Sequence, residues 1–404
     1  MNVRIIKSRA VGEVTAPPSK SMAHRLLIAA AMCDGVSRIE RISSCEDVLA
    51  TIDCLRALGV KIEYTDGCAV VEGCDLLHAS AHRPLNCRES GSTLRFLLPI
   101  AMLSENRSIL TGTKKLISRP EDVYEKICKE RGLLFEKDDA SITVRGRLTS
   151  GEYRIPGNVS SQFITGLLFA LSALQEESRI VITTALESRS YVELTRAAMA
   201  EFGVGVVWEN ENTLYISGRD KYRARDISVE GDWSGAAFIE AFNCIGGEAR
   251  VCGLNEDSLQ GDRAYRDMFA LISEGNPTIN IEDTPDLGPI LFTLASMHNG
   301  ATFIGTKRLK IKESDRALVM QSELSKFGAN IRVEDNSVTV FPAVLHKPQK
   351  TLYGHNDHRV VMSLAVIASV YGGDIEGCEA ISKSYPEFFD DIKKLGIEFE
   401  YYDT

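Results

Sequence analysis

A cluster of polar residues followed by a long apolar stretch recurs along the chain about every 70 residues. Within each stretch apolar side chains occupy nearly every position, and this pattern predicts a helix that is buried on all sides. Six such segments begin at Ser19, Ser90, Val159, Gly231, Thr284 and Gly354. The interval between the fourth and the fifth is shorter than the others.

A second kind of helix alternates with the buried ones. It is two-faced and ends in a glycine before alternating β-branched residues, which predicts a helix cap that leads into a half-exposed strand. The segments are EDVLATIDCLRALGVKIEY, PEDVYEKICKERGLLFE, YVELTRAAMAEFGVGVVWE, DRALVMQSELSKFGANIRVED and FFDDIKKLGIEFEY. Short strands such as SRIERI, SRIVITT and ATFIGT separate the helices. We expect an α/β (α+β) fold of six β-α-β-α-type repeats, three per domain, with the apolar helices inside and the sheets outside.

Length and composition agree with two soluble domains. At 404 residues the chain is too long for one ordinary core, and 44% of its residues are hydrophobic and 25% charged. No apolar run is long enough to span a membrane, and the first residues lack the pattern of a signal peptide. The ten cysteines show no paired spacing, which indicates reduced thiols. We therefore expect a cytoplasmic protein without a membrane partner.

The formal net charge of −10 makes the chain a poor general ligand for nucleic acid, and it makes cations at the helix starts conspicuous. Cations oppose the helix dipole there, whereas serine hydroxyls and backbone N–H groups suit an anion. If these helix starts converge, one cleft collects Lys20, Arg25, Arg95, Arg119, Lys312, Arg316, Arg359 and Lys383. Such a cleft would bind ligands that carry phosphate and carboxylate groups. The alternative for each cation is a surface position or a structural salt bridge.

Two acids stand among these cations. Asp286 and Glu313 could relay protons to and from a hydroxyl group and an alkene carbon. The plainer alternatives are a helix-capping role for Asp286 and a surface ion pair for Glu313. The sequence contains no P-loop, Rossmann, H-E-x-x-H or G-x-S-x-G motif. The histidines in the clusters are expected to be structural, and we expect no metal site.

Eight short segments combine these features: PPSKSMAHR, SGSTLR, SRPED, SSQFITGLL, SRSY, TPDLGP, KIKESDR and NDHR. In identity, order and spacing they resemble the EPSP synthase (3-phosphoshikimate 1-carboxyvinyltransferase) family over nearly the whole chain. The resemblance implies transfer of the enolpyruvyl group of phosphoenolpyruvate to the 5-hydroxyl of shikimate 3-phosphate, with release of phosphate. The reaction passes through a tetrahedral intermediate, requires no cofactor, and belongs to chorismate and aromatic amino acid biosynthesis.

The resemblance also implies roles for individual residues. Those implied to bind shikimate 3-phosphate are Lys20, Ser21, Arg25, Ser160, Ser161, Gln162, Ser188, Tyr191, Asp286 and Lys312. Those implied to bind phosphoenolpyruvate are Lys20, Gly91, Arg119, Arg316, Arg359 and Lys383. The implied catalytic residues are Asp286, Glu313 and Lys20.

The family's fold has two domains of three β-α-β-α-β-β units each, with buried parallel helices and outer sheets, an inside-out α/β barrel. On this basis we place one domain at residues 1–13 plus 229–404 and the other at 14–228, with the active-site cleft between them. We expect a monomer that closes over its substrates. Three departures from the family pattern are the segment from Glu89 to Ser92, Arg308 in place of a common asparagine, and Ser190 in place of a usual proline.

Two other interpretations remain open at this stage. The UDP-N-acetylglucosamine enolpyruvyl transferases share the fold and use a loop cysteine, and Cys87 lies near Gly91. The serine-rich SSQ cluster and the KESDR segment favour the shikimate enzyme. A nucleic-acid-binding or RNA-end-processing protein built on similar repeats is the other interpretation. The net charge and the lack of a basic stripe with aromatic residues argue against it.

Overall fold

The computed structural model describes residues 1–403 and divides the chain into two compact lobes. The terminal lobe comprises Met1–Pro17 and Gly231–Thr404, because the chain leaves this lobe early and returns to it. The central lobe comprises Pro18–Glu230. The sequence placed the two crossings near Val14 and Val229.

Three helices that are apolar nearly all round form the inside of the central lobe: α1 (Lys20–Ala31), α3 (Gly91–Ala101) and α6 (Ser161–Ser172). From Ala23 to its end, every residue of α1 is buried. The two-faced helices are α2 (Glu46–Ala57), α5 (Asp122–Arg131) and α7 (Arg189–Glu201), and α4 (Lys114–Ile117) is a single short turn. Helix α5 is followed by Gly132 as its C-cap, and the positive φ of this glycine (68°) confirms the predicted glycine cap.

Three four-stranded sheets cover these helices, in the orders β14-β3-β5-β4, β6-β7-β9-β8 and β10-β11-β13-β12. In each sheet the first two strands are parallel and the later pairs antiparallel. The strands are β3 (Val36–Glu40), β4 (Lys61–Thr65), β5 (Cys68–Glu72), β6 (Leu85–Asn86), β7 (Ser108–Thr111), β8 (Leu134–Lys137), β9 (Ser141–Arg145), β10 (Glu152–Ile155), β11 (Ser178–Ile182), β12 (Val206–Asn210), β13 (Thr213–Ile216) and β14 (Ile227–Ser228). Buried and exposed positions alternate along β3, so one face of its sheet packs on the helices.

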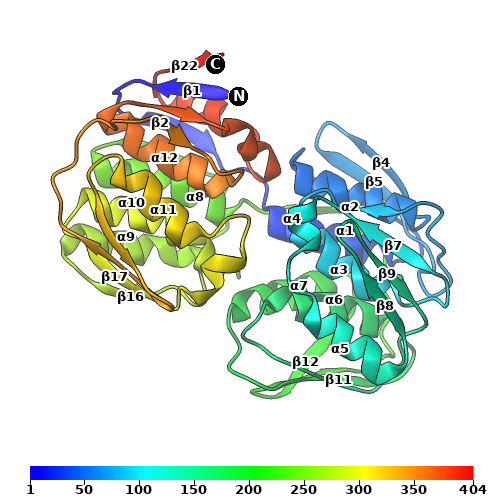
Figure 1. Ribbon diagram of the computed structural model, residues 1–404. Helices are drawn as coiled ribbons and strands as arrows, with labels where there is room; N and C mark the ends of the chain where they lie inside the picture. The colour runs from blue at the N-terminus through cyan, green and yellow to red at the C-terminus, as the bar shows by residue number, and fades with distance from the viewer. Residues whose placement is uncertain (404) are drawn as a thin grey trace. The chain divides into compact units, whose positions relative to one another are not determined.

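The terminal lobe repeats this plan. Its buried helices are α8 (Trp233–Glu240), α10 (Gly288–Met297) and α12 (His358–Tyr371), and its outer helices are α9 (Tyr265–Glu274), α11 (Arg316–Ser325) and α13 (Phe388–Lys394). Its 3₁₀ helices are η1 (Ala241–Ile245), η2 (Gly261–Ala264), η3 (Pro285–Leu287), η4 (Lys307–Ile311) and η5 (Cys378–Lys383). In Figure 1, α10 and α12 lie side by side within this lobe, with β16 and β17 at its rim.

Two four-stranded sheets and one two-stranded sheet complete the terminal lobe, in the orders β16-β17-β19-β18, β20-β21-β1-β22 and β15-β2. The strands are β1 (Asn2–Ile5), β2 (Val11–Thr15), β15 (Glu248–Cys252), β16 (Thr278–Asn280), β17 (Ala301–Ile304), β18 (Asn330–Val333), β19 (Ser337–Phe341), β20 (Leu352–Tyr353), β21 (Gly373–Glu376) and β22 (Phe399–Tyr402). The short fourth interval seen in the sequence corresponds to this reduced two-stranded sheet, since β15 follows α8 and its 3₁₀ extension.

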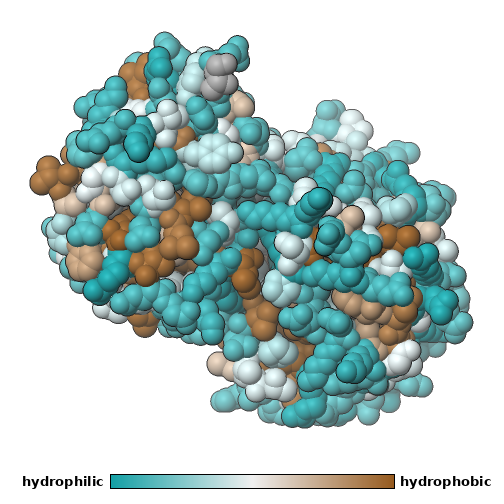
Figure 2. Space-filling view, viewed as in Figure 1, coloured by the Kyte–Doolittle hydropathy of each residue, from teal (hydrophilic) through white to brown (hydrophobic). Residues whose placement is uncertain are grey.

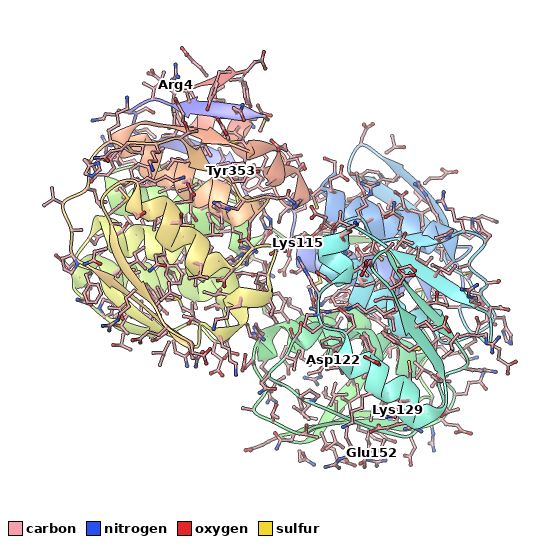
Figure 3. All side chains as sticks on the ribbon, in the orientation of Figure 1. Arg4, Lys115, Asp122, Lys129, Glu152 and Tyr353 are labelled. Atoms are coloured by element: carbon pink, nitrogen blue, oxygen red, sulfur yellow. The ribbon has the colours of Figure 1, made fainter. Side chains whose placement is uncertain are left out.

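The predicted fold class is confirmed, with helices inside and sheets outside in each lobe. Helix α9 was not among the predicted two-faced helices, although it occupies the same place in the fourth repeat. Charged side chains project from the outer layer, as Figure 3 shows for Arg4 on β1, Asp122 and Lys129 on α5, and Glu152 on β10. The face seen in Figure 2 is correspondingly hydrophilic over most of its area.

Candidate active site

The start of α1 presents Lys20 and Ser21. The side chain of Ser19 caps the helix by accepting a hydrogen bond from the N–H of Met22 (3.4 Å). The ammonium group of Lys20 lies 2.9 Å from Oδ2 of Asp47, and the two side chains are only 14% and 11% exposed. Asp47 therefore fixes the position of the Lys20 side chain at the start of α1.

Arg25 lies one turn further along α1 and is 2% exposed. Its Nε donates to the Thr195 hydroxyl (2.9 Å), one Nη donates to the Tyr191 carbonyl (3.0 Å), and its other Nη donates to the Ser21 carbonyl (2.6 Å). Burial lowers the pKa of Arg25 to about 10, so the side chain stays protonated at neutral pH. Among residues 1–403 no carboxylate forms an ion pair with it. A buried cation that is solvated only by dipoles is suited to bind an anion.

Gln162 joins the first turn of α6 to α3. Its side-chain oxygen accepts a hydrogen bond from Arg95 (3.0 Å), and its amide nitrogen donates to the Ser92 hydroxyl (3.0 Å). Ser160 caps α6 and accepts a hydrogen bond from the backbone N–H of Gln162 (3.3 Å), while Ser161 is buried beside it. These contacts fix the orientation of the Gln162 amide at the helix start.

Arg95, which the sequence placed in the cation cleft, forms a structural salt bridge instead. Its Nε lies 2.9 Å from Oε1 of Glu121, and the two side chains are 5% and 1% exposed. It also donates to the Pro120 carbonyl (3.0 Å) and lies over the ring of Phe163. The pair thus holds α3 against the segment before α5, as in the structural salt-bridge alternative.

Arg119 lies directly against Gly91 at the start of α3. A Cβ atom at position 91 would be 2.6 Å from Nη1 of Arg119, so a larger residue there would require the guanidinium group to move. The Nε of Arg119 is buried without a hydrogen-bond partner, and no carboxylate within the described residues pairs with this side chain. Helix α5 begins at Asp122, so Arg119 belongs to the preceding loop.

Helix α7 has Ser188 as its N-cap and contacts Arg25 through Tyr191 in its first turn. Ser188 is 2% exposed and adopts a left-handed conformation with φ of 55°, which is uncommon for serine. The Tyr191 ring centroid lies 5.9 Å from the Arg25 guanidinium group, and the Tyr191 carbonyl accepts from it. We call the predicted residues gathered here the Arg25 cluster; they are Lys20, Ser21, Arg25, Gly91, Arg119, Ser160, Ser161, Gln162, Ser188 and Tyr191.

A second group of predicted residues gathers in the terminal lobe around Arg316, which is 1% exposed. Its guanidinium group contacts three carboxylates: Asp286 (2.6 Å), Glu313 (2.7 Å) and Asp357 (2.9 Å). These carboxylates raise its pKa further above the ordinary value, against the opposing effect of burial. Arg316 is therefore a fixed positive charge at the centre of the cluster.

Asp286 is surrounded by cations. Besides Arg316, the amine of Lys312 lies 3.1 Å and Nη2 of Arg359 lies 3.3 Å from its carboxylate oxygens. Burial alone would raise the pKa of Asp286, but Arg359, Lys312 and Arg316 together hold it well below the ordinary value. Burial also lowers the pKa of the Lys312 amine, which Asp286 only partly offsets. Asp286 is thus ionised beside an amine that releases its proton more readily than usual.

Arg359 and Lys383 complete the terminal-lobe group. Arg359 donates to the Ser234 hydroxyl (2.7 Å) and to the Asp286 carbonyl (3.2 Å). Lys383 is 8% exposed and donates to the Asn356 carbonyl (2.6 Å). We call the predicted residues Asp286, Lys312, Glu313, Arg316, Arg359 and Lys383 the Arg316 cluster.

Sequence reasoning missed Asp357, which is fully buried and caps α12 by accepting the backbone N–H of Arg359 (3.0 Å). The NDHR segment contained the signal, because an aspartate before a buried helix is a typical N-cap. Its second role, as an ion-pair partner of Arg316, could not be predicted from the sequence because only the fold brings the two residues together. Ser234, the acceptor from Arg359, was missed for the same reason.

Cys87, the cysteine that left a second transferase family open, is fully buried. A hydrogen bond with the Cys54 thiol and burial raise its pKa well above the ordinary value, so it is a poor nucleophile. No cluster of three or more potential metal ligands occurs among residues 1–403. In the same part of the chain, no helix has both the length and the apolar composition needed to cross a membrane.

Comparison with known proteins shows the family of the chain. The family model described as EPSP synthase (3-phosphoshikimate 1-carboxyvinyltransferase) matches residues 5–392. The chain belongs to the EPSP synthase family. It is 38% identical to the 3-phosphoshikimate 1-carboxyvinyltransferase of Clostridium botulinum strain Alaska E43, over 98% of each protein. It is 39% identical to that of Clostridium novyi strain NT, over 98% of this chain and 97% of the relative.

A solved EPSP synthase structure from Acinetobacter baumannii has the same fold. It superposes with a TM-score of 0.80 at 21% identity, over 99% of each chain. The two-lobed architecture is therefore that of the EPSP synthase family, and this chain is an enolpyruvyl transferase of the shikimate pathway.

Proposed function

We propose that the Arg25 cluster and the Arg316 cluster act together as one active site, which transfers the enolpyruvyl group of phosphoenolpyruvate to the 5-hydroxyl of shikimate 3-phosphate. The observation that carries this proposal is the presence of two cations without carboxylate partners: Arg25, which is buried in α1, and Arg119, which lies against Gly91 at the start of α3. A protein keeps such charges where an anionic ligand supplies the missing partner. No metal or organic cofactor takes part.

Shikimate 3-phosphate binds chiefly to the central lobe. Lys20, Ser21 and Arg25 hold its phosphate at the start of α1, and Ser160, Ser161, Gln162 and Ser188 bind the phosphate and ring with Tyr191 beside them. The fixed orientation of Gln162, set by Arg95 and Ser92, supports this assignment, since a preoriented amide loses little entropy on binding. Asp286 and Lys312 bind the reacting hydroxyl from the terminal lobe.

Phosphoenolpyruvate binds through cations of both lobes. Arg119, beside Gly91, and Lys20 contribute from the central lobe, and Arg316, Arg359 and Lys383 contribute from the terminal lobe. Guanidinium groups bind carboxylate and phosphate in a bidentate way, which fixes the ligand as well as neutralising it. The space that Gly91 leaves against Arg119 supports the assignment.

The reaction is an addition followed by an elimination. The 5-hydroxyl oxygen attacks C2 of phosphoenolpyruvate, its proton passes to a base, and C3 takes a proton from an acid. The tetrahedral intermediate then loses phosphate, and a methyl proton leaves to restore the double bond. Asp286, Glu313 and Lys20 are the proton-handling groups. Bound phosphoenolpyruvate contacts Arg316 and Arg359 and weakens their ion pairs with Asp286. The pKa of the Asp286 carboxyl group therefore rises toward the range of a useful base.

We propose that the predicted domains, at residues 1–13 plus 229–404 and at 14–228, each contribute one cluster to the reaction. Closure around both substrates excludes water and prevents wasteful hydrolysis of phosphoenolpyruvate. We propose that the enzyme works as a monomer in the cytoplasm, with no nucleic acid or membrane partner.

Phosphate release tests the function. The purified protein should release phosphate from phosphoenolpyruvate only when shikimate 3-phosphate is present, and mass spectrometry should detect the enolpyruvyl product. UDP-N-acetylglucosamine serves as the control acceptor. Release with that acceptor, or no release with either, would contradict the proposal.

A further inference from the structure

Asp262 is a buried acid outside both clusters. It lies in η2, is 2% exposed, and neither carboxyl oxygen has a hydrogen-bond partner within residues 1–403. A buried carboxyl group without a partner reduces the stability of a fold. Its presence here therefore requires an explanation.

The position of Asp262 is fixed by its neighbour Gln260. The side-chain amide of Gln260 donates to the Gly231 carbonyl (2.8 Å), and its oxygen accepts the N–H of Trp233 (3.0 Å). Both contacts attach η2 to the start of α8, where Ser234 lies. The Ser234 hydroxyl is close enough to lower the pKa of Asp262, although it does not reach normal hydrogen-bond geometry.

Ser234 connects Asp262 to the Arg316 cluster. Its oxygen accepts a hydrogen bond from Nη1 of Arg359 (2.7 Å), and Nη2 of the same guanidinium group lies 3.3 Å from Oδ2 of Asp286. Ser234, Arg359 and Asp286 are thus linked in a row by polar contacts, and Asp262 lies beside Ser234 at the end of this row. Asp262, Ser234 and Arg359 are less than a tenth exposed.

Three charged groups face Asp262: Asp286 from η3, Arg359 from α12, and Asp232 at the cap of α8. Burial and the two acids raise its pKa, while Arg359 lowers it, and the outcome is a pKa of about 6. The charge of Asp262 therefore changes just below neutral pH, whereas Asp286 stays ionised.

We infer that Asp262 is a positioning residue for the transfer reaction, which orients Arg359 through Ser234 and so sets how firmly Arg359 holds phosphoenolpyruvate. When Asp262 is ionised, it draws the Ser234 O–H toward itself and leaves the oxygen lone pairs for Arg359. When it is protonated, its own O–H competes with Arg359 for the same oxygen. The inference rests on the function and on the role of Arg359 proposed above.

The test compares wild-type protein with Asp262→Asn and, as a matched control, with Asp267→Asn on the exposed side of α9. The Michaelis constant for phosphoenolpyruvate is measured between about pH 5 and pH 8. Relative to the control, Asp262→Asn should raise this constant about threefold to tenfold at pH 8, the size expected for one hydrogen bond. The difference should disappear near pH 5, where wild-type Asp262 is also neutral. Titration of the substrate itself is common to all three proteins.

An Asp262→Asn protein with the wild-type constant at every pH would overturn the inference and leave the function intact. A wild-type protein that releases no phosphate would instead overturn the function. If Asp262→Asn does not fold, Asp262→Glu decides the matter, because it keeps the charge but displaces it from Ser234. An altered constant for phosphoenolpyruvate with an unchanged constant for shikimate 3-phosphate supports the inference, and two unchanged constants contradict it.

Discussion

Glu313 shares the guanidinium group of Arg316 with two other acids, Asp286 and Asp357. Its carboxylate lies 2.7 Å from Arg316, and its side chain is 20% exposed. A group in this position can exchange protons with a bound ligand while Arg316 keeps it in place. The single residue therefore combines a structural contact with a proposed chemical role.

Glu313→Gln should separate the two roles, because glutamine keeps the size and the hydrogen-bonding capacity of glutamate but cannot carry a proton. We expect kcat to fall about 100-fold or more while KM for each substrate changes by less than about threefold, as for the loss of a general acid or base. Steady-state phosphate release measures both values. Glu334→Gln, at an exposed pair with Arg332, is the control. An unchanged kcat would remove Glu313 from the proton-handling group.

The raised pKa of Asp262 predicts an effect on stability as well as on catalysis. Its pKa in the fold, about 6, exceeds the ordinary value of 3.8, so the native state holds the proton more tightly than the unfolded chain does. The fold therefore loses stability at this site as pH rises from about 4 through 6. Asp262→Asn lacks this loss. Its free energy of unfolding relative to wild type should be higher at pH 8 than at pH 4 by roughly 1–3 kcal/mol, as measured by urea unfolding. An equal difference at both pH values would show that Asp262 does not titrate in the fold.

At the scale of the elements, the close approach of α3 and α6 holds the inside of the central lobe together. A Cβ atom at Gly166 would lie 2.3 Å from the Arg95 carbonyl oxygen and 2.4 Å from the Tyr124 hydroxyl. That hydroxyl donates to the Arg95 carbonyl (2.6 Å) and so joins α5 to both helices. Glycine is required here by packing and not by backbone conformation.

Gly166→Ala should destabilise the protein by about 1–3 kcal/mol, because overpacking outweighs the gain in helix propensity. Urea unfolding measures the change, and Gly275→Ala, where no atom lies within 4 Å of the added Cβ, is the control. If the two variants were equally stable, the helices would not be packed as closely as described.

The elements also show what the sequence could predict. The buried helices were recognisable because their apolar residues occupy every face, and their polar first turns contain most of the residues of the proposed site. Arg95 could not be told from Arg119 by position, since only the fold places Glu121 beside the former and Gly91 beside the latter. Helix α9 was missed in the shortened fourth repeat, where it ends at a Gly-Asn-Pro turn without the usual glycine-to-strand signal.

At the scale of the whole molecule, the proposed reaction requires the two clusters to bind the same pair of substrates. The terminal lobe supplies most of the acids and three of the proposed phosphoenolpyruvate ligands, and the central lobe supplies the unneutralised cations Arg25 and Arg119. Neither cluster holds all the groups that addition and elimination need. The proposed function therefore predicts that the protein becomes more compact when both substrates bind.

Small-angle X-ray scattering with defined ligands tests this requirement most directly. The radius of gyration of the wild-type protein should decrease when shikimate 3-phosphate and phosphoenolpyruvate are both present under turnover. With the same two ligands, Lys383→Met, which lacks one proposed phosphoenolpyruvate contact, should be less compact at equal ligand concentration. A wild-type radius of gyration that stays constant with both substrates bound would contradict the account.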